Sequence, residues 1–263
     1  MHSNPFDHYH ARNSPVHNVD PRMKVLLTFL YIISTALLPD GTWLAFTLSW
    51  ILIVLISLAS KIGFVFITKR SMIALPFALA AVTIIFTLPG QAIISIPLGD
   101  WELTATDTGL VRFISIMLRS WLSVQMAIIL IATTQFPDLI HAMRHLRLPK
   151  IIVSTIAFMY RYAFVLTDET IRMLRAREAR SARITMVAGG GSLLWRAKIA
   201  GNMAGQLFLR SYERSDRVYN AMVARGYQGV LLTMHPHALV SQDWIITLLF
   251  ASLILSIQLV GRM

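Results

Sequence analysis

The sequence predicts an all-α, polytopic membrane protein with about five transmembrane helices and further long helices on the cytoplasmic side. Of its 263 residues, 56% are hydrophobic and only 14% are charged, whereas soluble domains carry about 25% charged residues. The hydrophobic residues gather in runs that approach the length of roughly 20 residues a helix needs to cross the hydrocarbon core. Much of the positive charge lies in one arginine-rich stretch before the last of these runs.

Five apolar runs are the predicted transmembrane helices. The first is slightly short, and we expect Arg22 and Lys24 at its start to extend their charged ends to the lipid headgroups. Pro76 and Pro89 lie in or just after the third, where proline is tolerated if neighbouring groups satisfy the freed backbone. Arg119 lies inside the fourth near its proposed outer end, so a functional role and snorkelling explain it about equally well. The predicted spans are 23–38, 43–60, 71–88, 113–134 and 244–260.

The loops between these runs alternate in charge. The segments 1–24, 61–70 and 135–150 each carry three lysine or arginine residues. The loops 39–42 and 89–112 carry acidic residues and a single arginine at the very end of the second loop. By the positive-inside rule, the N-terminus is cytoplasmic, and so is the segment between the fourth and fifth spans.

This orientation divides the chain into four parts. We expect a cytoplasmic N-terminal segment at 1–22, a four-helix transmembrane region at 23–134 and a cytoplasmic helical module at 135–228. A loop and the last transmembrane helix follow at 229–263. The N-terminal segment has no apolar core followed by a small-residue cleavage site, so we do not interpret it as a secretory signal.

The cytoplasmic module begins with signals for a short amphipathic helix. Thr134 is its possible N-cap, and Pro137 lies in its first turn, where proline is tolerated. Pro149 then interrupts the pattern, after which a second helix is predicted from about Ile151 to Arg183.

Three consecutive glycines at 189–191 end this second helix. Ser192 is able to cap a third helix that continues to Arg225. Gly226 follows it, at the position where a positive φ angle is cheap for glycine.

The two long helices are basic on their polar faces. Between Tyr160 and Gln228 there are twelve lysine and arginine residues against five acidic residues. Gly201 and Gly205 on the third helix form a small-xxx-small pair, which lets two helix backbones approach closely. Arg161 follows an apolar run and is expected at the cytoplasmic boundary of the membrane.

Acidic residues on these helices are spaced for ion pairs. Asp168 with Arg172, and Glu213 with Arg217, have the favourable acid-first i,i+4 order. Asp168 and Glu169 are adjacent, so on a helix they point to different sides. We interpret them as surface or interhelical partners and not as a catalytic pair.

Several kinds of chemistry lack their motifs in this sequence. There is no cysteine, which excludes disulfides, thiolate metal sites and cysteine nucleophiles. There is no phosphate-binding G-x-x-x-x-G-K-[ST], no G-x-S-x-G and no H-E-x-x-H. We therefore expect a non-catalytic protein without a cofactor. If ATP drives the system, a separate protein hydrolyses it.

Histidines at both ends of the chain suggest a metal site, because imidazole is a common metal ligand. Their spacing matches no metal motif on a defined helix or strand, so the pattern favours incidental histidines in a polar tail and a polar loop. These residues are His2, His8, His10, His17, His235 and His237.

Two similar tripeptides stand at the ends of the two long helices, Ala179-Arg180-Ser181 and Ala224-Arg225-Gly226. Arginine at a helix C-terminus complements the macrodipole, and this alone explains its presence. The planar guanidinium also fits carboxylates and backbone carbonyls of a partner protein. The tripeptides alone favour ordinary C-terminal arginines on solvated helices, because three residues are weak evidence for a docking motif.

Longer stretches around these tripeptides resemble the transmembrane coupling subunit, or T component, of energy-coupling factor transporters in its CbiQ form. The resemblance covers essentially the whole chain. It is carried by MYRYAFVLTDETIRMLRAREARS at 159–181, YNAMVARGYQG at 219–229, NSPVHNVDPRMK at 13–24 and TTQFPDLIHAMRHLRLP at 133–149.

The resemblance implies that the two long helices are coupling helices that cross each other. It implies that Arg180 and Arg225 dock into grooves of two ATPase subunits, supported by the flanking residues Ala179, Ser181, Ala224 and Gly226. Ser181 departs from the family pattern, which has glycine there, and serine is costly if the position requires a positive φ angle. The expected supporting residues of the coupling helices are Arg161, Asp168, Glu169, Arg172, Arg177, Gly201 and Gly205.

The resemblance also implies the partners and the process. These are two CbiO-like ATPase subunits, a CbiM-like substrate-binding membrane subunit and a small CbiN-like subunit, in the lipid of the bacterial inner membrane and without nucleic acid. The implied function is energy coupling in cobalt uptake linked to cobalamin biosynthesis. The residues leave open a nickel or vitamin T component. They also leave open a different class, a membrane-embedded enzyme that acts on anionic lipid.

Overall fold

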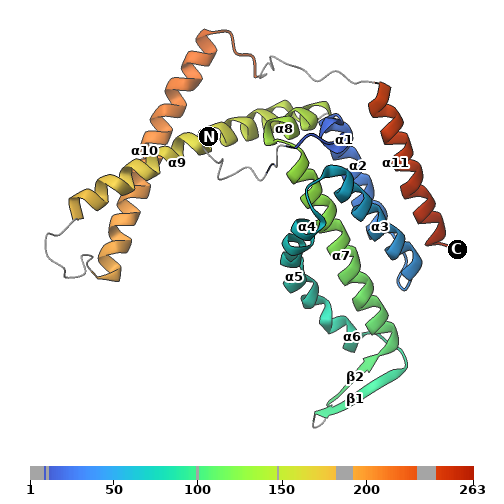
Figure 1. Cartoon of the computed structure of the whole chain (residues 1–263). Coiled ribbons are helices and arrows are strands. Elements are labelled where there is room, and N and C mark those ends of the chain that lie inside the picture. The colour runs from blue at the N-terminus through green and yellow to red at the C-terminus, as the bar shows by residue number, and fades with distance from the viewer. Residues whose placement is uncertain (1–8, 10–11, 99–100, 147, 182–191, 230–240) are drawn as a thin grey trace. The chain divides into compact units, whose positions relative to one another are not determined.

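The computed structural model describes residues 9, 12–98, 101–146, 148–181, 192–229 and 241–263 (Figure 1). The chain forms two compact units. The first, called the membrane unit below, comprises Met1–Leu146 and His235–Met263, and the second, called the arm, comprises Arg147–Met234.

Helices make up most of both units. The membrane unit contains α1 Pro15–Asn18, α2 Pro21–Ala36, α3 Trp43–Ser60, α4 Phe64–Ser71, α5 Leu75–Leu79, α6 Ile84–Thr87, β1 Ala92–Leu98, β2 Trp101–Thr106, α7 Asp107–Thr133, α8 Phe136–His145 and α11 Ser241–Val260. The arm contains α9 Lys150–Ser181 and α10 Leu193–Ala224.

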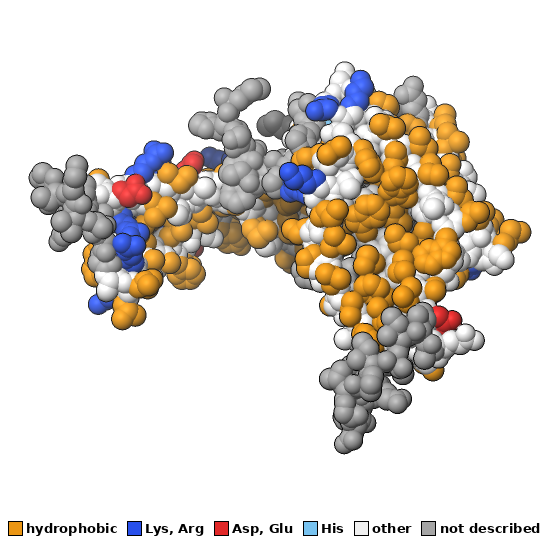
Figure 2. Space-filling view, turned by 60° about the horizontal axis from the view of Figure 1, so that its bottom comes forward, with side chains coloured by type: hydrophobic (Ala, Val, Ile, Leu, Met, Phe, Trp, Pro, Cys, Tyr) orange, Lys and Arg blue, Asp and Glu red, His pale blue; other side chains and the backbone are white. Residues whose placement is uncertain are grey.

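The core of the membrane unit lies among α2, α3, α7 and α11. Tyr31, Ile53, Leu122, Ile129 and Ile254 are among its buried side chains. The outer faces of the same helices are also apolar, and Figure 2 shows hydrophobic side chains covering much of the visible surface. A surface of this kind is stable in hydrocarbon, which confirms the prediction of an all-α polytopic membrane protein.

Four helices are long and apolar enough to cross a membrane by length and composition, among the described residues. They are α3, α7 and α11 in the membrane unit and α9 in the arm. Helix α2 has only 16 residues, slightly fewer than a perpendicular span requires. Helix α9 was expected on the cytoplasmic side, and its exposed residues Ile151, Ile152 and Met159 account for part of its apolar character.

The prediction of one continuous third span at 71–88 is wrong. This stretch is divided into the end of α4, a 3₁₀ turn at Met72–Ala74, α5, a second 3₁₀ turn at Ala80–Thr83, and α6. Pro76 lies at the start of α5, and its ring removes a backbone N–H that a continuous helix would use. These short segments pack against α7.

The prediction of a plain loop at 89–112 is also wrong. Strands β1 and β2 pair antiparallel there, with a bulge between Ala92 and Ile94. Helix α7 then begins at Asp107, earlier than the predicted 113, because the Thr106 side chain accepts a hydrogen bond from the Gly109 N–H at 3.2 Å and caps the helix.

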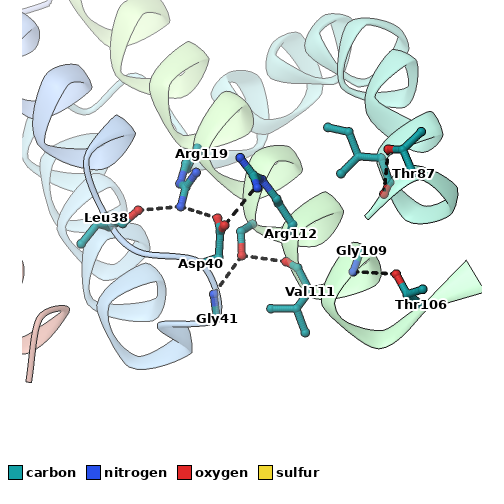
Figure 3. Close-up of polar contacts among 11 residues, drawn as sticks. Leu38, Asp40, Gly41, Thr87, Thr106, Gly109, Val111, Arg112 and Arg119 are labelled. Carbon is teal, nitrogen blue, oxygen red and sulfur yellow. Dashed lines mark hydrogen bonds and ion pairs between the residues drawn. The ribbon is translucent and has the colours of Figure 1, made fainter. Parts of the chain in front are cut away.

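Arg119 is paired within the protein, so snorkelling does not describe it. Its Nη2 donates to the Leu38 carbonyl at 2.5 Å and to Asp40 Oδ1 at 2.7 Å (Figure 3). One turn earlier on α7, Ser115 Oγ accepts a hydrogen bond from the Gly41 N–H at 3.1 Å. Helix α7 therefore clamps the turn between α2 and α3.

Two expectations for the N-terminal side of the membrane unit are corrected as well. Lys24 is only 8% exposed and does not extend to the headgroups. The described part of the N-terminal segment is not a free tail, because Ser14 and Asp20 are buried and cap α1 and α2.

The predicted N-cap of the short amphipathic helix is also corrected. Thr134 is the C-cap of α7, and the N-cap of α8 is Gln135.

Helix α8, which we expected in the cytoplasmic module, packs against α2 and belongs to the membrane unit. The ends predicted from the sequence for the two long helices agree better with the structure. Ser192 caps α10, since its side chain accepts a hydrogen bond from the Trp195 N–H. Helix α9 covers the predicted second helix within the described residues and begins at Lys150.

Candidate functional site

The two helices of the arm cross and are joined by ionic contacts at the crossing (Figure 1). Glu169 on α9 accepts hydrogen bonds from Arg210 on α10 and, at 2.9 Å, from Arg172 on its own helix. The Glu169 side chain is only 18% exposed. Beside it lies a hollow of about 120 Å³, lined by residues of both helices that include Leu166, Leu207 and Arg214. The crossing is therefore held by charge together with apolar contact.

The predicted ion pairs along the helices are wrong. Arg172 pairs with Glu169 and not with Asp168, which is exposed. Glu213 and Arg217 form no ion pair in the described part of the arm, although both line the hollow. Arg161 is exposed on α9 and has no ion pair among the described residues. The acid-first spacing is a weak preference of isolated helices, and here Arg172 pairs instead with Glu169, the acid that also pairs with Arg210 at the crossing.

The second tripeptide forms the end of α10. Arg225 is its C-cap, and Gly226 follows with a φ angle of 81°. The Gly226 N–H donates to the Val223 carbonyl at 2.9 Å, and the Tyr227 N–H donates to the Met222 carbonyl at 3.0 Å. This pair of hydrogen bonds is the Schellman motif, which uses glycine for the positive φ angle. The prediction that Gly226 ends the helix is confirmed.

The segment after Gly226 returns to α9. The Tyr227 ring packs edge-on against Phe158 with ring centroids 6.3 Å apart. Ser154 Oγ donates a hydrogen bond to the Gly229 carbonyl at 3.2 Å. The carboxyl end of α10 is therefore fixed against the first half of α9, and Arg225 is held with it. No local sequence pattern predicts these contacts, because Ser154 and Phe158 lie far from Tyr227 along the chain.

The first tripeptide forms the end of α9. Ala179 and Arg180 are exposed, and Ser181 is the last helical residue. Lys61 is the one non-glycine residue with a positive φ angle in the described part of the chain, so Ser181 is not strained in that way. Arg177, one turn earlier, is half-buried.

Arg180 and Arg225 share the same local setting. Both are exposed at the carboxyl end of a 32-residue helix, and neither has an ion pair among the described residues. Arg180 lies about 17 Å beyond Glu169, and Arg225 about 22 Å beyond Arg210, at a rise of about 1.5 Å per residue. Ala224 beside Arg225 is exposed as well.

Gly201 and Gly205 do not lie at the contact between the two helices. No atom lies within 4 Å of the position that a Cβ would take at either glycine. The α9 contact is made by other residues, such as Leu207 and Arg210, and the small-xxx-small pair faces open space. The supporting role of these two glycines on the coupling helices stays a prediction.

The histidines provide no metal site that the structure describes. His2, His8, His10, His235 and His237 lie outside the described residues. His17 lies on α1, where its Nδ1 is 2.6 Å from Ser14 Oγ. Within the described ranges, no three histidine, aspartate or glutamate residues are grouped so that they could hold a metal ion.

Comparisons with a family model and with individual proteins point to the same family. The family model CbiQ, described as Cobalt transport protein, matches residues 12–237. An uncharacterized protein of Methanocaldococcus jannaschii is 26% identical over 97% of this chain and 85% of its own length.

Two further relatives are each named Energy-coupling factor transporter transmembrane protein EcfT. The protein of Streptococcus equi is 30% identical over 84% of this chain and 82% of its own length. The protein of Listeria innocua is 28% identical over 84% of this chain and 83% of its own length. The chain therefore belongs to the CbiQ family, the transmembrane components of energy-coupling factor transporters.

Proposed function

We propose that this chain carries motion from two ATPase subunits to a substrate-binding membrane subunit in a cobalt importer. The observation that supports this most strongly is the pair of exposed arginines, Arg180 and Arg225, at the carboxyl ends of two crossing helices. Each arginine takes one ATPase subunit as its partner.

The docking role follows from the chemistry of arginine. A guanidinium offers five N–H donors in a rigid plane and stays charged at all relevant pH values. Neither guanidinium has an ion pair among the described residues, so both are available to carboxylates or backbone carbonyls in a partner's groove. The flanking residues Ala179, Ser181, Ala224 and Gly226 are small, so a groove can approach the helix ends closely.

The crossing makes the arm suited to transmit force. ATP binding closes the ATPase dimer and moves the two docked helix ends relative to each other. The contact between Glu169 and Arg210 acts as the pivot, because it joins the helices between their docked ends. The arm then passes this motion to the substrate-binding subunit. Arg161, Asp168, Arg172 and Arg177 support the first helix in this role.

In this proposal the chain itself is not an enzyme. ATP hydrolysis takes place in CbiO-like subunits, and the metal is bound by a CbiM-like subunit, accompanied by a small CbiN-like subunit. The chain lies in the inner membrane with its N-terminus and its arm in the cytoplasm. The name shared by the relatives, energy-coupling factor transporter transmembrane protein, supports a transport role over the membrane-enzyme alternative.

Cobalt is the proposed substrate because the family description names it. Uptake would then supply cobalamin biosynthesis. The name EcfT specifies no substrate, so nickel and vitamins remain the alternatives. Competition of labelled cobalt uptake by nickel or by vitamins, in the complete transporter, distinguishes them.

Uptake of labelled cobalt by cells that express the complete transporter tests the docking role. Loss of a charged contact at a protein interface costs about 2–5 kcal/mol. We therefore expect Arg225→Glu to lower uptake at least about tenfold, since each 1.4 kcal/mol corresponds to about a factor of ten. Arg175→Glu is the matched control, because Arg175 is exposed on α9 away from its end. Equal uptake by Arg225→Glu and wild type would contradict the proposal.

A further inference from the structure

A buried polar cluster in the membrane unit joins the N-terminal segment to two other helices, and the docking role does not use it. Asp20, Lys24 and Asp243 are 5%, 8% and 7% exposed. Charged side chains are costly in such surroundings unless they are paired, so a cluster of this kind is retained for a purpose.

Lys24 joins the ends of two helices. Its ammonium donates to the His17 carbonyl at 2.9 Å and to the Thr133 carbonyl at 3.3 Å. His17 lies in the last turn of α1, and Thr133 is the last residue of α7. Carbonyl groups at a helix C-terminus have no partner in their own helix and carry the negative end of the dipole. The positive charge of Lys24 therefore stabilises both helix ends together.

Asp20 joins the same segment to the last helix. Its backbone N–H donates to Asp243 Oδ1 of α11 at 3.2 Å. Its own Oδ1 accepts a hydrogen bond from the Arg22 N–H at 2.8 Å and caps α2. The carboxylates of Asp20, Asp138 and Asp243 all act on the charge of Lys24. The ammonium thus donates to carbonyls at the ends of α1 and α7 and is attracted by carboxylates on α8, on α11 and at the N-cap of α2.

The Thr133 carbonyl lies at the corner where α7 turns into α8. Only Thr134 and Gln135 separate the two helices, and both have extended backbone, with ψ angles of 127° and 148°. Helix α2 packs against both α7 and α8. A change at the Thr133 carbonyl therefore changes the direction in which α8 leaves the corner.

We propose that Lys24 is a positioning residue that fixes the α7–α8 corner through the Thr133 carbonyl. Helix α8 packs against α2 and ends at His145, and α9 begins at Lys150. The corner therefore sets the start of the last helix of the membrane unit before the chain enters the arm. The effect of Lys24 on transport rests on the coupling function proposed above, whereas its effect on the corner does not.

The experiment measures a distance within the membrane unit. Because the chain contains no cysteine, spin labels attach only at introduced cysteines. Leu58 on α3 and Leu146 at the end of α8 are 64% and 42% exposed, and Leu58→Cys with Leu146→Cys provides the pair. Pulsed electron paramagnetic resonance on the full-length protein in lipid nanodiscs then gives the distribution of distances between the labels.

Lys24→Met should broaden this distribution at least about twofold, because both carbonyls lose their donor. Lys24→Arg keeps a positive donor and should restore most of the original width. Lys69→Met is the matched control, since Lys69 is exposed and has no ion pair in the described part of the chain. An unchanged distribution in Lys24→Met would overturn the proposal.

A second variant covers the case in which Lys24→Met does not fold. Asp243→Ala removes the acceptor of the Asp20 N–H and should broaden the distribution less than Lys24→Met, but in the same direction. If Asp243→Ala leaves the width unchanged, the cluster does not act as one unit and the proposal fails.

The transport consequence is measured separately in the complete transporter. We expect Lys24→Met to retain bound ATPase and to lose about tenfold in cobalt uptake. Normal uptake together with a broadened distribution would contradict the link from the corner to coupling. If the wild type retains no ATPase, the coupling function fails, while the spin-label result still decides the role of Lys24.

Discussion

Arg180 and Arg225 occupy similar tripeptides, but the backbone holds them differently. Arg225 precedes a glycine with a φ angle of 81° and two hydrogen bonds that close the helix end. Arg180 precedes Ser181, which is itself helical. We infer that Arg225 is the more rigidly placed of the two and that its neighbour Gly226 is the less replaceable residue.

Gly226→Ala tests this difference. A side chain at a left-handed φ angle costs about 1–2 kcal/mol, and no atom lies within 4 Å of the added Cβ, so any effect comes from the backbone. We expect weaker ATPase binding and a lower unfolding temperature, measured on the purified complex. Ser181→Ala is the control and should change neither, because alanine suits a helix. Equal behaviour of the two variants would contradict the interpretation.

Gln125 on α7 is a buried polar residue whose side chain lowers the stability of the membrane unit. It is 0% exposed, and among the described residues neither its amide nitrogen nor its amide oxygen has a hydrogen-bond partner. A buried group of this kind costs about 1–3 kcal/mol.

Gln125→Leu should therefore raise the unfolding temperature in detergent. Gln258→Leu is the matched control, because Gln258 Oε1 accepts a hydrogen bond from Ser34 at 3.0 Å, so its replacement should not stabilise the protein. If Gln125→Leu lowers the unfolding temperature, the amide has a role that the structure does not explain.

The sequence predicts where a helix ends better than it predicts where an apolar run is interrupted. Ser192 and Gly226 act through contacts within a few residues, so both ends of α10 are readable from the sequence. The broken stretch 71–88 carries no charged residue, like a continuous span, and only Pro76 within it indicates the difference. The β1–β2 hairpin and the return of Tyr227 to Phe158 depend on distant residues, which periodicity does not reveal.

The clamp between α7 and the α2–α3 turn is a contact between elements that periodicity also misses. Arg119 donates to both Leu38 and Asp40 (Figure 3). Its side chain is 20% exposed and that of Asp40 is 36% exposed, so water screens part of the interaction.

Arg119→Met should destabilise the protein by about 1–2 kcal/mol, a reduced value for a charge-assisted hydrogen bond. Arg112→Met is the control, because Arg112 lies 3.7 Å from Asp40 and its side chain is 52% exposed. Thermal unfolding of both variants in detergent checks this. A larger loss of stability for Arg112→Met than for Arg119→Met would show that Arg119 does not make the main contact between α7 and the α2–α3 turn.

In the molecule as a whole, the membrane unit and the arm are held together by different kinds of contact. The membrane unit has an apolar core with polar contacts near its helix ends, at Lys24 and at Arg119. The arm has an ionic crossing and a returning segment at the end of α10. We infer that each unit is held together by its own contacts, which suits a protein that passes motion from one partner to another.

The composition and the resemblance predicted the membrane class and the family, and both are confirmed. The docking role of Arg180 and Arg225 stays a prediction. A role in binding depends on a partner's groove, and no residue of this chain encodes the shape of that groove. The same holds for the substrate, which another subunit binds in the proposed complex.

Co-purification shows whether Arg180 and Arg225 hold the ATPase subunits. The tagged chain is expressed with a cobalt-type ATPase subunit and the complex is isolated in mild detergent. We predict that the wild type retains two ATPase copies and that Arg180→Glu with Arg225→Glu retains none. The control pair Arg175→Glu with Lys198→Glu makes the same charge change at exposed residues that do not line the hollow at the crossing, and it should retain both copies. Failure of the wild type to retain ATPase, or equal retention by the docking variant, would contradict the account.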